Sequence, residues 1–177
     1  MNLNGARLVC EKLGVSNDSF LEAISSFRGA SNRLEMVKRS VHKIMFKDFA
    51  HSPSKVGATV TAVREQFLNH HLAACLELHT FSSLNEEFLM EYQGTLLKAD
   101  EAIVYFNPHT IEHKRLEPIT EGQVRSAFGG ANLKVFTDSG ELTHYLGRFD
   151  HEKQVFLMMT SGNFDGVDFE ALAEEVI

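Results

Sequence analysis

Asp48 and His51, an acid and an imidazole that could contact a ligand, come shortly after the apolar run Ile44–Phe46. Ser52 and Pro53 then favour the start of a helix, since serine is a good N-cap and proline suits the first helical position. A strand, a short loop and a helix would place both side chains at the carboxyl end of the strand, where ligands bind in open α/β sheets. Asp48 could accept hydrogen bonds from a ribose or help to hold a metal ion; alternatively, both residues only shape a turn.

Two later segments would reach the same edge of such a sheet. Residues 77–85 follow the apolar run 72–76, and residues 160–166, which include two glycines and an asparagine, follow the run 155–159. Glycine and asparagine also favour ordinary strand-to-helix turns, so the second segment is either a ligand loop or a plain turn. Parallel strands all end at the same edge of a sheet, which would bring the three segments together.

One histidine pattern suggests a metal site but lacks its structural context. His109, Glu112 and His113 fit H-x-x-E-H, a zinc-peptidase pattern. The pattern follows a proline, a helix there would be short, and the sequence indicates no third ligand, so we expect no metal at these residues. His70 and His71 are expected to lie in a solvated loop before a strand.

The composition limits the classes of function. With 177 residues and 44% hydrophobic residues, the chain can bury the core of one domain and a little more. A net charge of −7 argues against sequence-independent nucleic-acid binding, yet it permits nucleotide binding through backbone N–H groups and a few cations. Cys10 and Cys75 form no disulfide framework. No apolar run is long enough to span a membrane and no signal-peptide layout is present, which favours the cytosol.

Apolar runs alternate with amphipathic helices along the chain, as in parallel sheets that are covered on both faces. The predicted fold class is α/β, a Rossmann-like, mostly parallel sheet of about six strands with helices on both faces, preceded by two short helices. The first strand, within residues 33–39, should be an antiparallel edge, because the turn at 40–43 is too short for a parallel crossover. Capping residues predict helix starts at Ser19, Ser83, Thr120, Asp138 and Asp168.

Two neighbouring motifs resemble a known family. Residues 27–35 form F-x-G-x-x-x-R-x-E, and residues 48–53 form D-F-A-H-x-P. The pair resembles the junction between the central ATP-binding domain and the C-terminal domain of the Mur ligases, cytoplasmic bacterial enzymes that use ATP to build the cell-wall peptide. The resemblance continues through residues 77–82 and 160–166, so it covers nearly the whole chain.

The resemblance implies a domain boundary. Residues 1–28 would be the helical end of the central ATP-binding domain, and residues 29–177 would be the C-terminal domain. Two short amphipathic helices cannot bury their apolar faces alone, so we expect a piece of a larger enzyme whose N-terminal and central domains are missing; a true N-terminus at Met1 is the alternative. The family's G-x-x-x-x-G-K-[ST] loop and magnesium ligands belong to the central domain. The chain alone is therefore expected to bind no cofactor and to be inactive.

The resemblance also assigns roles near the junction. Arg33 matches the family arginine that reaches the ATP phosphates when the domains close, so it is the catalytic and nucleotide-binding candidate, and a guanidinium can stabilise phosphoryl charge during transfer. Asp48 matches an aspartate that contacts the ribose, and His51 matches a histidine with a positioning or structural role. Lys47 and Ser52 depart from the family, in which a second acid and a histidine are frequent, and this weakens the roles of their neighbours.

The substrate-binding candidates follow two strands. Relatives often have Pro-Arg where this chain has Leu78 and His79, and they have a glycine-rich loop with a phenylalanine after the last strand. Exposed N–H groups in such a loop suit the carboxylates of an acidic peptide. The candidates are His79, Thr80, Ser82, Ser161, Gly162, Asn163 and Phe164.

Within the family, the sequence most resembles the recycling ligases. Such an enzyme would use ATP and Mg²⁺ to join UDP-N-acetylmuramate to the tripeptide L-alanyl-γ-D-glutamyl-meso-diaminopimelate in the bacterial cytoplasm, without nucleic acid or membrane. This domain would bind the tripeptide and close over the nucleotide. The alternatives are the ligase that adds L-alanine to UDP-N-acetylmuramate, a folylpolyglutamate synthase, or a non-catalytic α/β binding module.

Overall fold

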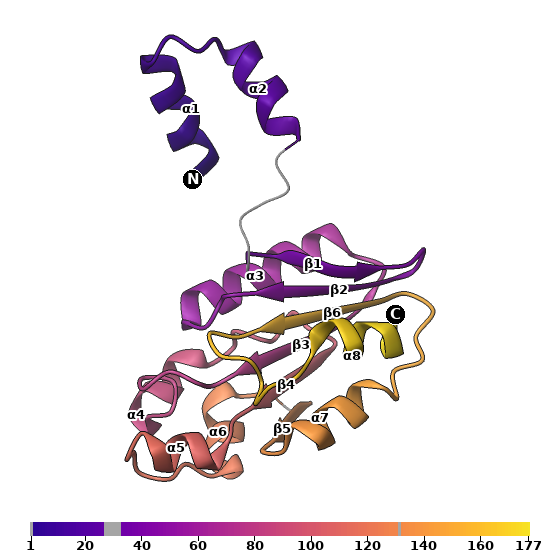
Figure 1. The fold of residues 1–177 in the computed structure, drawn as a ribbon. Helices are drawn as coiled ribbons and strands as arrows, with labels where there is room; N and C mark the ends of the chain where they lie inside the picture. Colours follow the sequence, from indigo (N-terminus) through magenta and orange to yellow (C-terminus); the bar gives the residue numbers. More distant parts are fainter. Residues whose placement is uncertain (1, 27–32, 131) are drawn as a thin grey trace. The chain divides into compact units, whose positions relative to one another are not determined.

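The computed structural model describes residues 2–26, 33–130 and 132–177. The chain forms two compact units, residues 1–30 and residues 31–177, which we describe separately (Figure 1). The first unit contains α1 (Asn2–Lys12) and α2 (Asn17–Ser25).

The turn between these two helices is specified locally. Gly14 has φ +86°, a left-handed conformation that glycine adopts without steric cost. The side chain of Ser16 caps α2 and accepts the N–H of Ser19 at 3.2 Å. The predicted capping box at Ser19 is therefore wrong, because the chain is still extended at Ser16 and is already helical at Ser19.

The second unit is built on one six-stranded sheet in the order β1-β2-β6-β3-β4-β5. The strands are β1 (Glu35–Arg39), β2 (Lys43–Asp48), β3 (His71–Glu77), β4 (Glu101–Tyr105), β5 (Leu133–Phe136) and β6 (Gln154–Met159). β1 pairs antiparallel with β2, and every other pair of neighbours is parallel. The predicted fold class and the antiparallel edge strand are confirmed.

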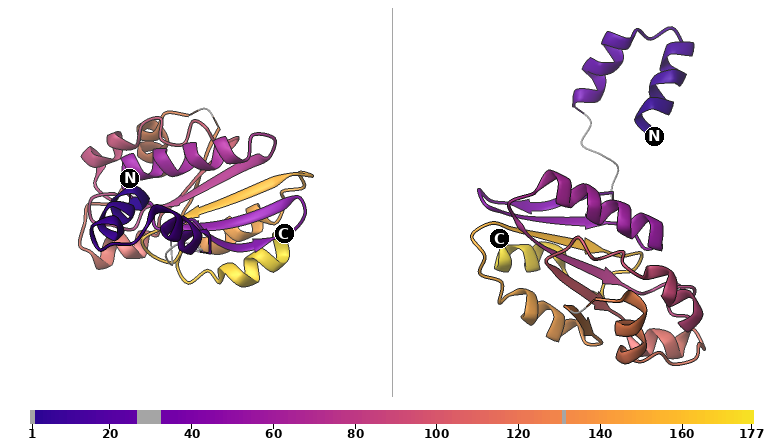
Figure 2. Two further views of the ribbon diagram at one scale, coloured as in Figure 1. Left: turned by 90° about the horizontal axis from the view of Figure 1, so that it is seen from above. Right: turned by 180° about the vertical axis from the view of Figure 1, so that it is seen from behind.

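Helices cover both faces of the sheet (Figure 2). The helices of this unit are α3 (Pro53–Gln66), α4 (Glu86–Leu89), the 3₁₀ helix η1 (Met90–Tyr92), α5 (Pro108–His113), α6 (Glu121–Phe128), α7 (Ser139–Leu146) and α8 (Phe169–Val176). The helices α3, α4 and α6 share one core with η1 and α5, whereas α7 and α8 build the other. The connections from β2 to β5 advance across the sheet and the connection from β5 to β6 returns, so right-handed crossovers put α7 on the opposite face.

The strands contribute side chains alternately to the two cores. In β6, Val155 and Leu157 belong to the α3 core, whereas Phe156 and Met158 belong to the core under α7 and α8. All four side chains are fully buried. Side chains alternate with a period of two along a strand, so a strand that is covered on both faces has a continuous apolar run.

Three of the predicted helix caps are confirmed. Thr120 accepts the N–H of Gln123 at 3.2 Å, and the Gln123 side chain accepts the N–H of Thr120 at 2.7 Å, which completes a capping box. The side chains of Asp138 and Asp168 cap α7 and α8. These caps depend only on residues within one helical turn, which is why a local sequence pattern can indicate them.

The predicted cap at Ser83 is wrong. Asn85 caps α4 and accepts the N–H of Phe88 at 3.1 Å. The Ser83 hydroxyl instead donates to the carbonyl of Thr80 at 3.1 Å, within a turn that precedes the helix. The loop after β3 therefore contains one more turn than the sequence pattern indicated.

His71 is not in a solvated loop, contrary to the prediction. It is the first residue of β3, it is half-buried, and its ring stacks on His151 with 3.8 Å between centroids and 11° between planes. The segment that leads from α7 to β6 brings His151 and Phe149 against it. This contact joins residues that are distant in the sequence, so no local pattern signalled it.

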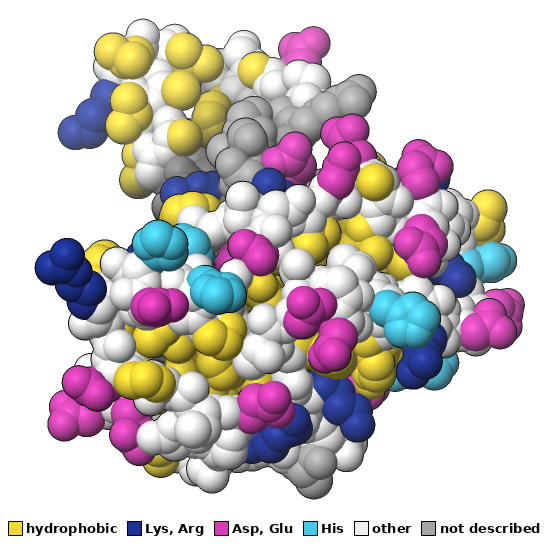
Figure 3. Space-filling model, turned by 60° about the horizontal axis from the view of Figure 1, so that its bottom comes forward, with side chains coloured by type: hydrophobic (Ala, Val, Ile, Leu, Met, Phe, Trp, Pro, Cys, Tyr) yellow, Lys and Arg dark blue, Asp and Glu magenta, His cyan; other side chains and the backbone are white. Residues whose placement is uncertain are grey.

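The surface of the described residues carries charges of both signs. Acidic and basic side chains are interspersed on the face shown in Figure 3. Among the described residues, no helix has the length and apolar character that a bilayer crossing requires.

Candidate ligand site at the carboxyl edge of the sheet

Five parallel strands end at one edge of the sheet, which we call the carboxyl edge (left in Figure 1). β6 lies between β2 and β3, and its last residue, Met159, pairs with both Asp48 and Leu76. The N–H of Thr160 donates to the carbonyl of Asp48 at 3.0 Å. The chain leaves β2 and β3 towards one face and leaves β6 towards the other. Such reversals are where open α/β sheets bind ligands.

A hollow of about 240 Å³ opens beside the end of β2. We call it the Arg33 hollow; its lining residues are Arg33, Asp48, Phe49, Ala50, Lys55, Ala58 and Thr59. Two exposed cations, Arg33 and Lys55, lie near one carboxylate, that of Asp48. A guanidinium presents a planar set of donors that matches phosphate oxygens, and an ammonium adds a compact positive charge. The Arg33 hollow can therefore bind an anion.

Asp48 fixes the backbone around this hollow. One carboxylate oxygen accepts the N–H of Leu34 at 2.6 Å, and the other accepts the N–H of Ala50 at 2.7 Å. Leu34 has φ 44°, which is unusual for a residue with a side chain, so the bond from Asp48 stabilises a strained position next to Arg33. The Thr59 hydroxyl donates to the oxygen that also accepts the N–H of Ala50, at 3.5 Å. In this conformation Asp48 orients the segment that carries Arg33, and the oxygen bound to Leu34 can accept one further hydrogen bond.

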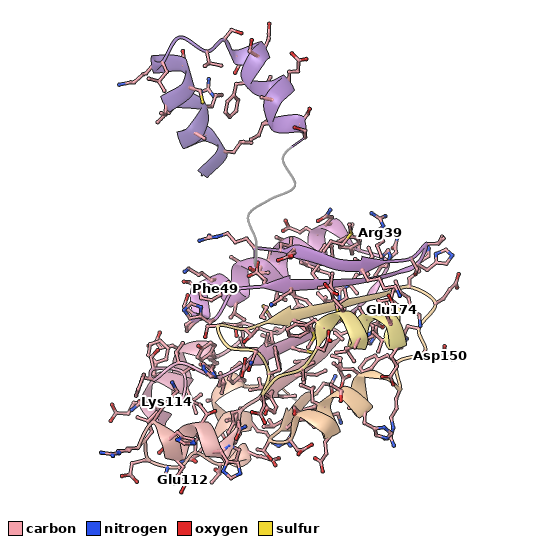
Figure 4. The ribbon with its side chains drawn as sticks, in the orientation of Figure 1. Arg39, Phe49, Glu112, Lys114, Asp150 and Glu174 are labelled. Carbon is pink, nitrogen blue, oxygen red and sulfur yellow. The ribbon has the colours of Figure 1, made fainter. Side chains whose placement is uncertain are left out.

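His51 lies outside the lining of the Arg33 hollow. Its Nδ1 is 2.9 Å from the carbonyl oxygen of Phe49, and its ring meets the Phe49 ring edge-on with 5.0 Å between centroids. Its own carbonyl accepts the hydroxyl of the buried Tyr92. These contacts give His51 a part in shaping the loop between β2 and α3. Figure 4 labels Phe49 at the end of β2.

A second group of residues meets where β3 and β6 end. We call Glu77, His79, Thr160, Gly162 and Phe164 the Glu77 cluster. Glu77 accepts the N–H of Phe164 at 3.0 Å and the hydroxyl of Thr160, and its other oxygen lies 3.5 Å from Nδ1 of His79. Thr160 in turn accepts the N–H of Gly162 at 2.7 Å. The cluster therefore ties the loop after β6 to the loop after β3.

Glu77 was not among the predicted site residues, although the sequence contained a signal for it. It is an acid at the end of an otherwise apolar strand, and only 3% of its surface is exposed. Buried carboxylates require partners, so an acid in such a run points to donors from another segment. The sequence could not identify those donors, because they lie 83 and 87 positions later.

The loop after β6, residues 160–166, is called the β6 loop. Its predicted site residues have different environments. Asn163 is exposed, and Ser161 and Gly162 are half-buried. Ser161 has a buried hydroxyl oxygen without a hydrogen-bond partner among the described residues. Phe164 is fully buried, with its ring 5.7 Å from Tyr105 and 5.8 Å from Phe169, so its side chain belongs to the core and only its backbone faces the cluster.

Tyr105, which contacts Phe164, ends β4 at the same edge. Burial, together with the nearby charges of Asp165 and Glu77, raises the pKa of Tyr105 to about 12. The phenol therefore stays protonated at neutral pH and acts as part of the wall behind the β6 loop.

The loop after β3, residues 78–85, is called the β3 loop. Its predicted site residues Thr80 and Ser82 lie near the surface. Ser82 is exposed, and Thr80 is half-buried. The Thr80 hydroxyl oxygen accepts the N–H of Ser83 at 3.1 Å and lies 3.1 Å from the hydroxyl of Ser82, so it stabilises the turn. Phe81, which is 61% exposed, is covered on one side by the ammonium of Lys114 at 4.4 Å from the ring centroid.

The residues of the H-x-x-E-H pattern lie on the six-residue helix α5. His109 and Glu112 form an exposed contact with 3.8 Å between Nδ1 and a carboxylate oxygen, and each side chain is 85% exposed. In the described parts of the chain, no group of three or more His, Cys, Asp or Glu side chains could hold a metal ion. We therefore assign no ligand of Mg²⁺ or Zn²⁺ to these residues.

Comparison with known proteins identifies related chains. No protein-family model matches this sequence. A UDP-N-acetylmuramate–L-alanine ligase of Desulfitobacterium hafniense is 23% identical over 165 residues, which make up 92% of this chain and 36% of the relative. The solved structure of UDP-N-acetylmuramate–alanine ligase from Thermotoga maritima gives a TM-score of 0.73 at 19% identity and covers 99% of this chain and 36% of that one.

A further solved structure is similar to this chain over almost its whole length. It is a domain from Haemophilus ducreyi that carries the name of a UDP-N-acetylmuramate:L-alanyl-γ-D-glutamyl-meso-diaminopimelate ligase, with a TM-score of 0.54 at 21% identity over 81% of this chain and 96% of that one. The present chain spans 36% and 30% of the first two curated relatives. The six-stranded, mostly parallel sheet with helices around it matches the Rossmann-like fold of the C-terminal domain of the Mur ligases.

Proposed function

We propose that this chain is the domain of an ATP-dependent amide-forming ligase that receives the amine substrate and closes over the nucleotide. One observation carries the proposal: the Arg33 hollow and the Glu77 cluster lie at the ends of neighbouring strands on the carboxyl edge. A ligase of this type must bring an activated carboxylate and an amine together, and adjacent sites on a rigid sheet edge can do so.

The proposed reaction has two steps. A carboxylate oxygen of UDP-N-acetylmuramate attacks the γ-phosphorus of ATP, so an acyl-phosphate forms and ADP leaves. The amine of the second substrate then attacks the acyl carbon, phosphate leaves, and an amide forms after the amine loses a proton. Arg33 is the proposed catalytic residue of this chain, because its guanidinium can stabilise charge on the transferring phosphoryl group.

Each predicted residue has a place in this proposal. Asp48 holds the Arg33 segment and can contact the ribose, and His51 supports the same loop. The amine substrate would be bound by the side chains of His79, Thr80 and Ser82 and by the loop of residues 161–164, in which the N–H groups of Gly162 and Phe164 fix the loop through Thr160 and Glu77. A phosphate-binding loop and Mg²⁺ would be supplied by further domains of a longer bacterial, cytoplasmic enzyme, of which residues 1–28 would be the end of the ATP-binding domain.

We propose the tripeptide L-alanyl-γ-D-glutamyl-meso-diaminopimelate as the amine substrate. The extent of the likeness to the Haemophilus ducreyi domain supports this choice. L-alanine is the second candidate, because the sequence relatives from Desulfitobacterium hafniense and Cytophaga hutchinsonii are UDP-N-acetylmuramate–L-alanine ligases. With an acidic chain, long-range attraction would not help an acidic peptide, so recognition must come from N–H groups at short range.

Chemical-shift mapping on the purified chain tests the proposal. The tripeptide should shift the amides of residues 79–82 and 161–166 with a Kd of roughly 1 mM, about −4 kcal/mol, because the other domains are not present. ATP should shift Arg33 and Asp48 instead. Titration with L-alanine in parallel compares the two amines.

Tripeptide shifts confined to the opposite edge, near Asn69 or Gly130, would contradict this site and favour a non-catalytic binding module. Steady ATP hydrolysis by the chain, abolished by Asp48→Ala, would contradict the dependence on a separate phosphate-binding domain.

A further inference from the structure

Glu77 is the only Asp, Glu, Lys or Arg side chain that is buried in the described part of the chain. A carboxylate that loses its water needs donors within the protein. Glu77 has two, namely the N–H of Phe164 at 3.0 Å and the hydroxyl of Thr160, and Nδ1 of His79 lies 3.5 Å from its other oxygen. Both donors belong to the loop after β6, so the carboxylate joins two loops that are distant in the sequence.

The β6 loop needs such a support because its backbone is strained. Phe164 has φ 50° and Asp165 has φ 59°, both in the left-handed region that side chains disfavour, and Gly166 continues it with φ +86°. The bond from the N–H of Phe164 to Glu77 holds the first of these residues. Strained residues persist where the surrounding contacts determine them, and such positions cluster at ligand sites.

The packing of the loop against Glu77 is close. A Cβ atom at Gly162 would lie 2.8 Å from the His79 ring and 2.9 Å from a Glu77 oxygen. The N–H of Gly162 is held by Thr160, which donates to Glu77, so the loop, the carboxylate and the imidazole have one relative arrangement. A change at Glu77 would therefore move the loop and His79 together.

We propose that Glu77 is a positioning residue of the amine-substrate site. Its carboxylate holds the β6 loop in its strained conformation and orients His79, and it does not itself touch the substrate, because only 3% of it is exposed and both oxygens already have partners. This inference rests on the proposed function for the identity of the substrate. We call the contacts of Glu77 with Thr160 and Phe164 the latch. The latch does not depend on the identity of the substrate.

Three variants test the latch. Glu77→Gln keeps the shape but replaces charge-assisted bonds with neutral ones, which are about half as strong. Thr160→Val removes the hydroxyl at similar volume, and Thr160→Ser retains it. Glu87→Gln, on the exposed surface of α4, is the matched control. Dispersed amide signals from β3 and β6 show whether each variant folds.

Two measurements are made on each variant. Hydrogen exchange of the Phe164 amide should be at least about tenfold faster in Glu77→Gln and Thr160→Val, because local opening costs less. Tripeptide affinity should fall about tenfold in the same two variants, equal to about 1.4 kcal/mol. Thr160→Ser should restore both values towards wild type, and Glu87→Gln should change neither.

The outcomes separate the latch from the proposed function. Unchanged exchange at Phe164 in both disruptive variants would overturn the latch. Faster exchange with unchanged tripeptide affinity would overturn the positioning role. If the wild-type chain binds neither the tripeptide nor L-alanine, the proposed substrate site fails, and faster exchange in the variants would still support the latch.

Discussion

The two edges of the sheet are built in different ways. At the carboxyl edge, the backbone has positive φ at Leu34, Phe164 and Asp165, and a buried carboxylate ties two loops together. Among the described residues, no non-glycine residue with positive φ lies at the amino edge, where the parallel strands begin. In Figure 4, Phe49 marks the carboxyl edge, and Arg39 and Asp150 mark the amino edge.

The amino edge is held by a network around one arginine. Arg64 donates to the carbonyls of Lys98 and His70, each at 2.9 Å, and pairs with Asp100. Asp100 also accepts the N–H of Leu72 at 2.7 Å. Burial tends to raise the pKa of Asp100, but the bonds from Leu72 and Arg64 outweigh it and hold this pKa below its usual value. The network joins α3 to the start of β3 and β4.

Under the proposed function, stability and ligand binding are assigned to opposite ends of the same strands. Hydrogen bonds at the amino edge fix how the strands begin, and their partners adopt ordinary backbone conformations. At the carboxyl edge, the strained residue Phe164 is held by its hydrogen bond to Glu77, in the loop that we propose for the amine substrate. Variants at the two edges should therefore affect different measurements.

The largest effect on stability is expected from Asp100→Ala. The change leaves the N–H of Leu72 without its acceptor and removes one of the three acceptors of Arg64. A buried donor that is left without an acceptor costs about 1–3 kcal/mol. Urea unfolding should show this loss, while tripeptide affinity stays unchanged. Asp150→Ala, at an exposed position of the same edge, is the control and should change neither value. A loss of affinity without a loss of stability would break the contrast between the edges.

The second-largest effect, on tripeptide affinity, is expected at the carboxyl edge from Gly162→Ala. The new Cβ would meet the His79 ring at 2.8 Å, so the loop or the ring must move. Tripeptide affinity should fall about tenfold, which corresponds to about 1.4 kcal/mol, with a smaller change in urea stability. Gly122→Ala is the matched control, because the nearest atom to its Cβ is at 3.9 Å. Full affinity in Gly162→Ala would show that the loop is not part of the site.

The smallest effect, on the pH dependence of stability, is expected from the stacked histidines His71 and His151 at the amino edge. Burial lowers the pKa of His71 below 6.5, and the charge of His151 acts in the same direction, whereas Asp100, Gln154 and Glu101 oppose it. The unfolded chain therefore takes up this proton first as the pH falls through about 6.5. The free energy of unfolding should decrease from that pH downwards until the folded protein is protonated as well.

Urea unfolding at a series of pH values measures this dependence. His71→Gln should flatten the curve between pH 7 and the folded pKa, and His144→Gln, at an exposed position on α7, should leave it unchanged. A curve that is equally steep in His71→Gln would assign the dependence to another group. His70 is the first group to examine in that case, because burial lowers its pKa too.

Hydrophobic periodicity and turn length were sufficient to predict the six strands and their directions. The continuous apolar runs predicted a parallel sheet covered on both faces, since each strand alternates its side chains between two cores. The caps at Thr120, Asp138 and Asp168 were predictable because their bonds lie within one helical turn. The short turn before β2 was enough to predict the antiparallel edge strand.

The assembly of the carboxyl edge could not be predicted from local patterns, because it depends on long-range contacts. The position of β6 between β2 and β3 follows from how the last crossover returns across the sheet, and no local pattern encodes it. That position brings Thr160 and Phe164 to Glu77, 83 and 87 residues earlier, and turns the Phe164 ring into the core. Because a buried charge is stable only beside its donors, the role of Glu77 exists only once both loops are in place.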